Sequence, residues 1–447
     1  MSSEKHSPAA AYAAPRVHHT LDATLSIPGS KSLTNRELVL AALAEGPSTI
    51  RGGLVARDSA LMIEALRQFG ALIEEDQDAD GVPLWHITPI RFTQLAEKPL
   101  VIDCGLAGTV MRFVPPLALL GFQPVTFTGD AQAEARPMAT MIDALRQLGA
   151  TVDDGGTGTL PFTITPGGLP TQEHTITIDA SASSQFISGL LLAASRFPAP
   201  LTIEHSGAHL PSQPHIDMTI AALAHRGVSV DFYGGTRWSV TPQTIKASDC
   251  TIEPDLSNAA PFLAAALVAG GQVSIRDWPE STTQVGDQLR FLLREFGAVV
   301  EYDNRTLSVQ AAGLTSQVRL PSVNLDLSEA GELAPTLVTL SVFSSGTSVF
   351  RGIGHLRGHE TNRLAALVEN ITSLGGVATE TADGIIVTPA PLHGGVWKAF
   401  GDHRMATSGA LVGLAVEGVE VDDINQTAKT LPEFVDLWEQ MIGGLRR

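Results

Sequence analysis

The sequence is poor in cysteine and aromatic residues, and it lacks any long apolar run. Only two of its 447 residues are cysteines, Cys104 and Cys250, so we expect no disulfide framework and place the chain in a reducing cytoplasm. No apolar run reaches the length of about 18 residues that marks a membrane helix. Residues 1–16 lack the apolar core of a secretory signal, and their composition predicts a disordered tail.

Positive charge is also scarce. The chain has 29 Lys and Arg residues against 47 Asp and Glu residues, which gives a formal net charge of −18. An acidic surface repels phosphodiester backbones, so nucleic acid is not an expected partner. A small anionic substrate stays possible, because a few converging cations dominate the field at short range. The length predicts two or three domains of about 150 residues each.

One amphipathic helix type recurs along the chain, and each copy ends at a glycine that precedes a strand-like segment. These glycines are Gly70, Gly149, Gly227, Gly297, Gly375 and, in a weaker copy, Gly443. A glycine in that place is typical of a helix C-terminus that needs a positive φ.

A second helix type is apolar on nearly every face, which predicts helices buried inside a domain. Its six copies occupy residues 37–46, 110–121, 186–197, 262–271, 333–346 and 405–418. Pro115 and Pro116 fit the second copy poorly, so that helix must kink or start late.

The two helix types alternate with strands, which predicts six strand–helix–strand–helix–strand units of about 72 residues each. Six buried helices fit an α/β protein of two domains with three units each, and the halfway boundary falls near Asp249–Pro254. The alternative is an ordinary doubly wound α/β protein, whose pattern does not include helices buried inside a shell of sheets.

Cations stand where the buried helices begin, notably Lys31, Arg36 and Arg404. Ser, Asp and Asn at these places are explained by helix capping alone. Helix capping does not explain the cations, because the positive end of the helix dipole disfavours them. An anion held between the cations and the backbone N–H groups would resolve the conflict.

Three other motifs do not fit their usual functions. The run 29–32 is not a phosphate-binding loop, because Leu25 and Ser30 stand where that motif needs glycine, and 155–158 predicts a hairpin turn rather than a dinucleotide loop. His355 and His359 have helical i, i+4 spacing, but Gly358 argues against a metal-binding helix, so we expect no metal.

Eight ordered motifs together resemble the 5-enolpyruvylshikimate-3-phosphate synthases, which are 3-phosphoshikimate 1-carboxyvinyltransferases. They are PGSKSLTNR (28–36), LAGTVMRF (106–113), ARPM (135–138), SSQFISGLLLAA (183–194), PHID (214–217), HETNR (359–363), DHRMA (402–406) and TAKTLPEF (427–434). The resemblance implies an inside-out α/β fold of two domains, each with three βαβαββ units around buried parallel helices. It places the N-terminal domain at 29–253, the C-terminal domain at 17–28 plus 254–447, and the active site in the interdomain cleft.

The resemblance also implies roles for individual residues. Shikimate-3-phosphate would be bound by Lys31, Ser32, Arg36, Ser183, Ser184, Gln185, Ser212, Glu332 and His359. Phosphoenolpyruvate would be bound by Lys31, Gly108, Arg136, Gln185, Arg363, Arg404 and Lys429. Among the catalytic residues, Glu332 would be the base for the 5-hydroxyl and Glu360 the acid for the methylene carbon, with Lys31 as the third.

The sequence departs from the family pattern at five places. Leu106 replaces a common Asn, His359 a common Lys, His355 a common Asn and His215 a common Tyr, while Glu332 is one methylene longer than the usual Asp. The resemblance leaves open whether His215 and His355 contact substrate.

The implied activity transfers the enolpyruvyl group of phosphoenolpyruvate to shikimate-3-phosphate, in the cytoplasm, by a monomer that needs no metal or organic cofactor. Three alternatives stay open at this point. They are the related transferase that acts on UDP-N-acetylglucosamine, an RNA 3′-phosphate cyclase of related fold, and a non-catalytic anion-binding protein. The first usually carries a Cys before its Arg-Pro pair, and 129–138 has none. The charge of −18 opposes the second, and the intact Lys31 and Glu332 oppose the third.

Overall fold

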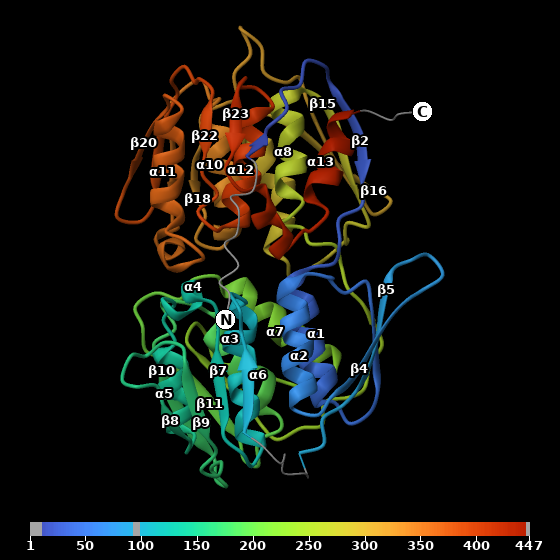
Figure 1. The fold of residues 1–447 in the computed structure, drawn as a ribbon, viewed down its shortest axis with the longest axis vertical. Coiled ribbons are helices and arrows are strands. Elements are labelled where there is room, and N and C mark those ends of the chain that lie inside the picture. The colour runs from blue at the N-terminus through green and yellow to red at the C-terminus, as the bar shows by residue number, and fades with distance from the viewer. Residues whose placement is uncertain (1–10, 93–98, 444–447) are drawn as a thin grey trace, which may run out of the picture. The chain divides into compact units, whose positions relative to one another are not determined.

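The computed structural model describes residues 11–92 and 99–443, which fall into two compact units (Figure 1). The N-terminal unit is Pro28–Glu253, and the C-terminal unit takes the chain up to Ile27 and from Pro254 onward. Each unit has its own hydrophobic core. Within the described ranges, every helix is too short or too polar to span a bilayer.

The second repeat shows how one unit of the fold is built. Its elements are β6 (Leu100–Asp103), α3 (Gly108–Phe113), η1 (Pro115–Leu120), β7 (Val125–Thr128), α4 (Ala131–Glu134), α5 (Ala139–Gln147), β8 (Thr151–Asp153) and β9 (Phe162–Thr165). The buried helix connects β6 to β7, so these strands are parallel, whereas β9 runs antiparallel to both β7 and β8. The resulting sheet order is β6-β7-β9-β8.

The third and fifth repeats follow the same plan. The third contains β10 (His174–Ile178), α6 (Gln185–Ala194), β11 (Leu201–His205), α7 (Gln213–His225), β12 (Asp231–Phe232) and β13 (Arg237–Val240). The fifth contains β18 (Asn324–Asp326), η3 (Gly331–Leu333), α10 (Ala334–Ser341), β19 (Ser348–Arg351), η4 (Gly354–Gly358), α11 (Arg363–Ser373), β20 (Val377–Glu380) and β21 (Ile385–Thr388).

The first and fourth repeats borrow their first strands from elsewhere in the chain. The first has α1 (Lys31–Leu43), β3 (Ser48–Arg51), α2 (Arg57–Gln68), β4 (Leu72–Gln77) and β5 (Pro83–Thr88). The fourth has α8 (Ala260–Ala269), β15 (Gly271–Arg276), η2 (Val285–Gln288), α9 (Leu289–Glu295), β16 (Val299–Asp303) and β17 (Thr306–Ala311). β14 (Cys250–Thr251) pairs in parallel with β3, and β2 (Leu21–Leu25) pairs in parallel with β15. The N-terminal unit therefore takes this strand from its last residues, and the C-terminal unit takes its strand from the segment that precedes the N-terminal unit.

The sixth repeat ends differently, because the structure describes no hairpin after its second helix up to residue 443. It contains β22 (Gly395–Trp397), α12 (His403–Gly413), β23 (Val419–Val421), η5 (Ile424–Lys429) and α13 (Phe434–Gly443). β1 (Tyr12–Ala13) completes its sheet by pairing with β23. The disordered tail predicted for residues 1–16 is therefore wrong for residues 11–16, and residues 1–10 lie outside the described part.

Packing explains why this segment is ordered. The amide of Ala14 donates to the carbonyl of Val419, and that of Val17 donates to Leu414. A Cβ at Gly413 would lie 2.2 Å from the Cβ of Ala14, so only glycine lets the segment approach α12 this closely.

The predicted buried helices are confirmed. In α8, every residue from Ala260 to Val268 is buried, and α8, α10 and α12 contact one another in the C-terminal unit. In the N-terminal unit, α1, α3 and α6 pack together in the same way. The five stop glycines from Gly70 to Gly375 have φ between 78° and 100°, as the sequence predicted.

The proline pair breaks the second buried helix in a way that the sequence left open. α3 ends at Phe113, and a 3-10 helix continues from Pro115. Proline at the first position of a new helix loses no hydrogen bond, since that N–H has no helical partner.

Candidate active site

In the N-terminal unit, the first turn of α1 presents Lys31 and Ser32. Ser30 caps the helix, and its Oγ accepts a hydrogen bond from the amide of Leu33 at 3.5 Å. The side chain of Lys31 is 21% exposed, and its Nζ lies 3.5 Å from Oδ2 of Asp58, which is buried at the start of α2. The ammonium group is therefore held at the end of a buried helix, where it can still meet a ligand.

Arg36 is 1% exposed and forms a buried junction instead of facing solvent. Its Nε donates to Oγ1 of Thr219 at 2.8 Å, and Nη2 donates to the carbonyl of His215 at 2.9 Å. Nη1 donates to the carbonyl of Ser32 at 2.8 Å. The guanidinium therefore fixes the first turn of α1 to α7, and this burial favours a positioning role.

Three further predicted ligands surround the start of α6, and a fourth precedes α7. The amide of Gln185 donates to Oγ of Ser183 at 3.3 Å, and Ser184 stands as the N-cap of α6. Ser212 precedes α7 with φ of 54°, a left-handed conformation that costs a non-glycine residue free energy. Strain of this kind is found most often at functional sites. His215 is buried, and its carbonyl accepts from Arg36 and from Oγ of Ser188.

Gly108 lies beside two guanidinium groups at the start of α3. A Cβ at Gly108 would lie 2.9 Å from Nη1 of Arg112 and 3.1 Å from Nη2 of Arg136. Nη1 of Arg136 donates to the carbonyl of Leu106 at 3.3 Å. The sequence predicted Gly108 and Arg136 as ligands but missed Arg112. The signal was a basic residue inside an otherwise apolar helix, where burial of a charge requires a compensating partner.

In the C-terminal unit, Glu332 and Arg404 face each other across the starts of the buried helices. Nη2 of Arg404 lies 3.2 Å from Oε2 of Glu332, and the side chains are 14% and 23% exposed. Oγ of Ser257, just before α8, donates to the same Oε2 at 2.9 Å. The sequence motifs predicted Glu332 and Arg404 as site residues, whereas the residues near Ser257 were explained by helix capping alone.

A second group of charges lies at the starts of α11 and α12. Glu360 accepts from Nζ of Lys429 at 2.7 Å through Oε1 and from Nη2 of Arg363 at 3.0 Å through Oε2. Arg363 also binds both carboxylate oxygens of Asp402, at 2.7 and 3.2 Å. Burial opposes the charge on Arg363, but Asp402 and Glu360 outweigh it and raise the pKa of that guanidinium. Arg363 is therefore a permanent cation.

The two histidines of this region lie close together. The rings of His355 and His359 have centroids 5.8 Å apart, and Nδ1 of His359 lies 3.9 Å from Oε2 of Glu360. His355 packs over η3, since a Cβ at Gly331 would lie 2.6 Å from its Nε2. Among the residues that the structure describes, no three His, Cys, Asp or Glu side chains are grouped to hold a metal ion.

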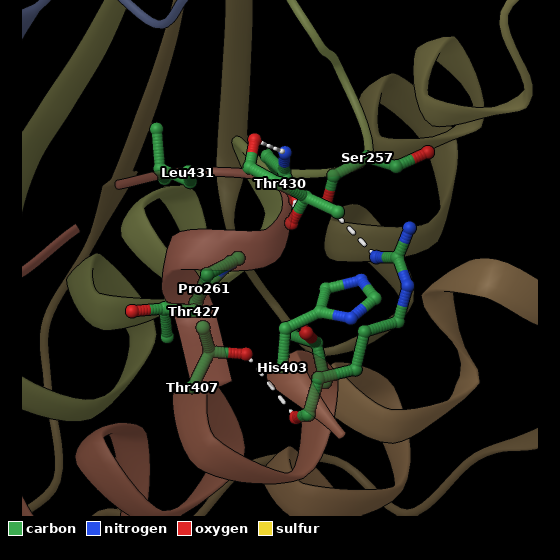
Figure 2. A pocket seen from close by; sticks show the side chains of 10 residues that line it. Ser257, Pro261, His403, Thr407, Thr427, Thr430 and Leu431 are labelled. Carbon is green, nitrogen blue, oxygen red and sulfur yellow. Dashed lines mark hydrogen bonds between the residues drawn. The ribbon is translucent and has the colours of Figure 1, made fainter. Parts of the chain in front are cut away.

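A small pocket lies behind these charges, and Figure 2 shows it from close by. Its lining includes His403 and Thr407 of α12, Ser257 ahead of α8, and Thr427 and Thr430 from η5 and its end. The free volume is about 10 Å³, which is close to the space that one water molecule needs. Its lining also includes Pro261 and Leu431, so hydroxyl and apolar groups meet between the starts of α8 and α12.

Each unit therefore contains one group of side chains with the properties of an anion site, and these groups are named the N-terminal and the C-terminal half-site. Helix N-termini supply partial positive charge, and Lys and Arg side chains add full charges beside them. The N-terminal half-site adds serine hydroxyl groups, whereas the C-terminal half-site adds the two carboxylates that can accept or donate protons. Both cysteines lie outside these sets. Burial raises the pKa of the Cys104 thiol, and it raises the pKa of Cys250 to about 12.

Comparisons with known proteins agree with this fold. The sequence model described as EPSP synthase (3-phosphoshikimate 1-carboxyvinyltransferase) matches residues 15–438. A 3-phosphoshikimate 1-carboxyvinyltransferase of Kocuria rhizophila is 52% identical over 427 residues, which cover 94% of each chain. Among solved structures, an EPSP synthase of Acinetobacter baumannii has a TM-score of 0.77 at 23% identity and covers 96% of this chain and 97% of its own. The enolpyruvyl transferase NikO of Streptomyces tendae has a TM-score of 0.72 at 17% identity, with 96% of each chain covered.

Proposed function

Because the chain belongs to the EPSP synthase family and transfers the enolpyruvyl group of phosphoenolpyruvate to the 5-hydroxyl of shikimate-3-phosphate, we propose that the two half-sites described above carry out this step. The step belongs to the shikimate pathway, which leads to chorismate and the aromatic amino acids. The observation that carries the residue assignment is the pairing of each candidate carboxylate with a cation, Glu332 with Arg404 and Glu360 with Lys429. An acid, a base and phosphate-binding cations are what this chemistry needs.

The N-terminal half-site holds most of shikimate-3-phosphate in this proposal. The phosphate is bound by serine hydroxyl groups and the N-terminus of α6, at Ser183 and Ser184. Lys31 supplies the nearest full positive charge, at the N-terminus of α1. Ser32, Gln185 and Ser212 bind the remaining oxygens. Arg36 acts through the protein, because its nitrogens hold Ser32 and α7 in place.

Phosphoenolpyruvate is bound by cations from both units. Arg136 with the backbone at Gly108, together with Lys31 and Gln185, contributes from one unit. Arg404, Lys429 and Arg363 contribute from the other. Lys429 and Arg404 are partly exposed, so they can reach an anion, whereas Arg363 is 2% exposed and holds Asp402 and Glu360. His359, at 32% exposure, completes the contacts to shikimate-3-phosphate.

The proton transfers fall to the two glutamates. Glu360 donates a proton to C3 of phosphoenolpyruvate, which makes C2 electrophilic. The 5-hydroxyl oxygen of shikimate-3-phosphate then adds to C2 while Glu332 takes its proton, and a tetrahedral ketal forms. The Glu360 carboxylate then takes a proton back from C3 as the bond from C2 to the phosphate oxygen breaks and phosphate leaves. Lys31 helps to neutralise the charge that develops on the phosphate, since both substrates are polyanions.

We also propose that the enzyme acts in the cytoplasm as a monomer. Both half-sites come from one chain, so the reaction requires no second copy, and the two cysteines are free thiols. Light scattering across a range of protein concentrations tests the monomer, and a mass near twice the 47.1 kDa of one chain would contradict it.

The role of Glu332 is tested by Glu332→Gln, which keeps size and hydrogen bonding but removes proton acceptance. We expect phosphate release to slow by about 100-fold or more, with little change in KM for either substrate. Glu329→Gln changes an exposed neighbour and serves as the matched control. Normal turnover of Glu332→Gln would place the base elsewhere. Replacing shikimate-3-phosphate by UDP-N-acetylglucosamine in the same assay should give no phosphate.

A further inference from the structure

The turn before α8 donates a hydrogen bond to the candidate base, and nothing in the reaction as described above uses it. Oγ of Ser257 donates to Oε2 of Glu332 at 2.9 Å. The carbonyl of the same residue accepts from Nη1 of Arg404 at 3.4 Å. Ser257 is 6% exposed, so both contacts are shielded from water. One residue thus touches the base with its side chain and the substrate-binding cation with its backbone.

The turn itself is fixed on several sides. The amide of Leu256 donates to Oε1 of Gln284 at 3.2 Å, and that of Asn258 donates to Oδ1 of Asp255 at 3.0 Å. Nδ2 of Asn258 donates to the carbonyl of Thr430 at 3.1 Å, on the side of the pocket where Figure 2 shows Ser257 and Thr430 close together. A Cβ at Gly286 would lie 2.4 Å from the carbonyl carbon of Leu256, so η2 packs directly against the turn. Ser257 therefore has little freedom to move.

We propose that Ser257 is a positioning residue for the enolpyruvyl transfer. Its hydroxyl keeps the Glu332 carboxylate oriented toward the substrate when Arg404 binds phosphoenolpyruvate. This rests on the proposed role of Glu332 as the base. Arg404 and the Ser257 hydroxyl both contact Oε2 of Glu332. When the anionic substrate binds the guanidinium, the hydroxyl still donates to Oε2 and helps to hold the carboxylate in one orientation.

The hydroxyl also sets the proton affinity of the base. A hydrogen bond donated to a carboxylate favours its charged form, so removal of that donor makes the carboxylate easier to protonate. The base must be unprotonated to act. Loss of the Ser257 hydroxyl should therefore move the acid limb of the activity profile toward higher pH, whereas a purely structural serine would leave that limb in place.

The test compares Ser257→Ala with Ser257→Thr, which retains the hydroxyl. We expect Ser257→Ala to lower kcat by about 10-fold and to shift the acid limb of kcat upward by about one pH unit, with KM for both substrates changed less than about 2-fold. Ser257→Thr should restore most of kcat and the original limb. Ser408→Ala is the matched control, because Ser408 is a buried serine of α12 whose Oγ has no hydrogen-bond partner among the described residues.

The double variant separates this proposal from the assignment of the base. If Ser257 acts through Glu332, adding Ser257→Ala to Glu332→Gln should change kcat by less than about 2-fold. Full activity of Glu332→Gln would overturn the base itself. An inactive Glu332→Gln combined with an unshifted pH profile for Ser257→Ala would overturn only the role of Ser257. If thermal melting shows that Ser257→Ala is unfolded, the acid limb of kcat is measured on Ser257→Cys, whose thiol is a weak donor. An acid limb of Ser257→Cys at the wild-type pH would also overturn the role of Ser257.

Discussion

Gly108 offers the sharpest test of the phosphoenolpyruvate contacts, since a single methyl group there meets two cations. In Gly108→Ala, the new Cβ would lie 2.9 Å from Nη1 of Arg112 and 3.1 and 3.2 Å from the two Nη atoms of Arg136. Contacts that short require the guanidinium groups to move by some tenths of an ångström. All three atoms are at the far ends of flexible side chains, so the movement costs the fold little.

The expected effect is on binding rather than on stability. Weakening one hydrogen bond from a charged group costs about 1.5–3 kcal/mol, and each 1.4 kcal/mol is about tenfold. KM for phosphoenolpyruvate should therefore rise by about 10- to 150-fold. The residues assigned to shikimate-3-phosphate lie at the starts of α1, α6 and α7 or, like Glu332 and His359, in the C-terminal unit, so its KM should stay within about 2-fold. Thermal stability should be unchanged or slightly higher, because alanine favours a helix over glycine.

Steady-state kinetics with each substrate varied in turn measures this difference, and Gly121→Ala is the control. Gly121 follows η1, it has φ of −95°, and an added Cβ would make only an ordinary contact of 3.6 Å with the carbonyl of Ala118. A rise in both KM values for Gly108→Ala would refute the assignment of Gly108 to the pyruvyl half of the site. An unchanged KM for phosphoenolpyruvate would refute any contact there.

Three further predictions test other parts of the structure. Lys429→Met should raise KM for phosphoenolpyruvate by about 10-fold or more, whereas Lys398→Met, which breaks the exposed pair with Glu369, should leave both KM values unchanged. Glu37→Gln removes the charge that pairs with the fully buried Arg226 at 2.8 Å, so the free energy of unfolding, measured with denaturant, should fall by about 3–5 kcal/mol. The control Glu75→Gln, at the exposed pair with Arg67, should lower it by at most about 1 kcal/mol. Burial raises the pKa of Cys250 to about 12, so its thiol should be alkylated slowly at pH 8 in the native protein and rapidly in denaturant. Because the raised pKa favours the neutral thiol, the stability that this group contributes is complete below pH 9 and falls as the pH rises toward 12.

The repeats were predictable because they rest on local patterns. Helices apolar on every face must be buried, and a glycine after an amphipathic helix ends it, so α8 and the stop at Gly149 follow from composition and spacing. The pairing of β14 with β3 is not local, since about 200 residues separate the strands and no periodicity marks it. The pairing of Tyr12–Ala13 with β23 was missed for a related reason. Two residues carry no alternation, and the evidence for order is the packing of Ala14 on Gly413.

The site was predictable at the level of residue types and not at the level of partners. Family motifs supplied Arg404, Glu332 and Lys429, but their order in the sequence does not show which side chains meet. Arg36 illustrates the limit, because the motifs predict a substrate contact, which stays a prediction, but do not reveal that the residue is 1% exposed with donors on Thr219 and on two backbone carbonyls. Whether a cation faces a ligand or a neighbouring helix depends on packing, which one sequence does not record.

The ion pairs of the C-terminal half-site connect substrate binding to proton transfer. The cations assigned to phosphoenolpyruvate are already paired with the carboxylates assigned to the chemistry, with Arg404 on Glu332 at 3.2 Å and Lys429 on Glu360 at 2.7 Å. An arriving anion therefore exchanges one partner for another, and the net gain in attraction is smaller than the number of cations implies. A carboxylate that loses its cation becomes a stronger proton acceptor. Release of Glu332 from Arg404 would thus strengthen the base at the moment when phosphoenolpyruvate is in place, and release of Glu360 from Lys429 would let that glutamate carry the proton it must deliver. On these proposed assignments, the exchange would make binding of the anion a condition for the acid and the base to act.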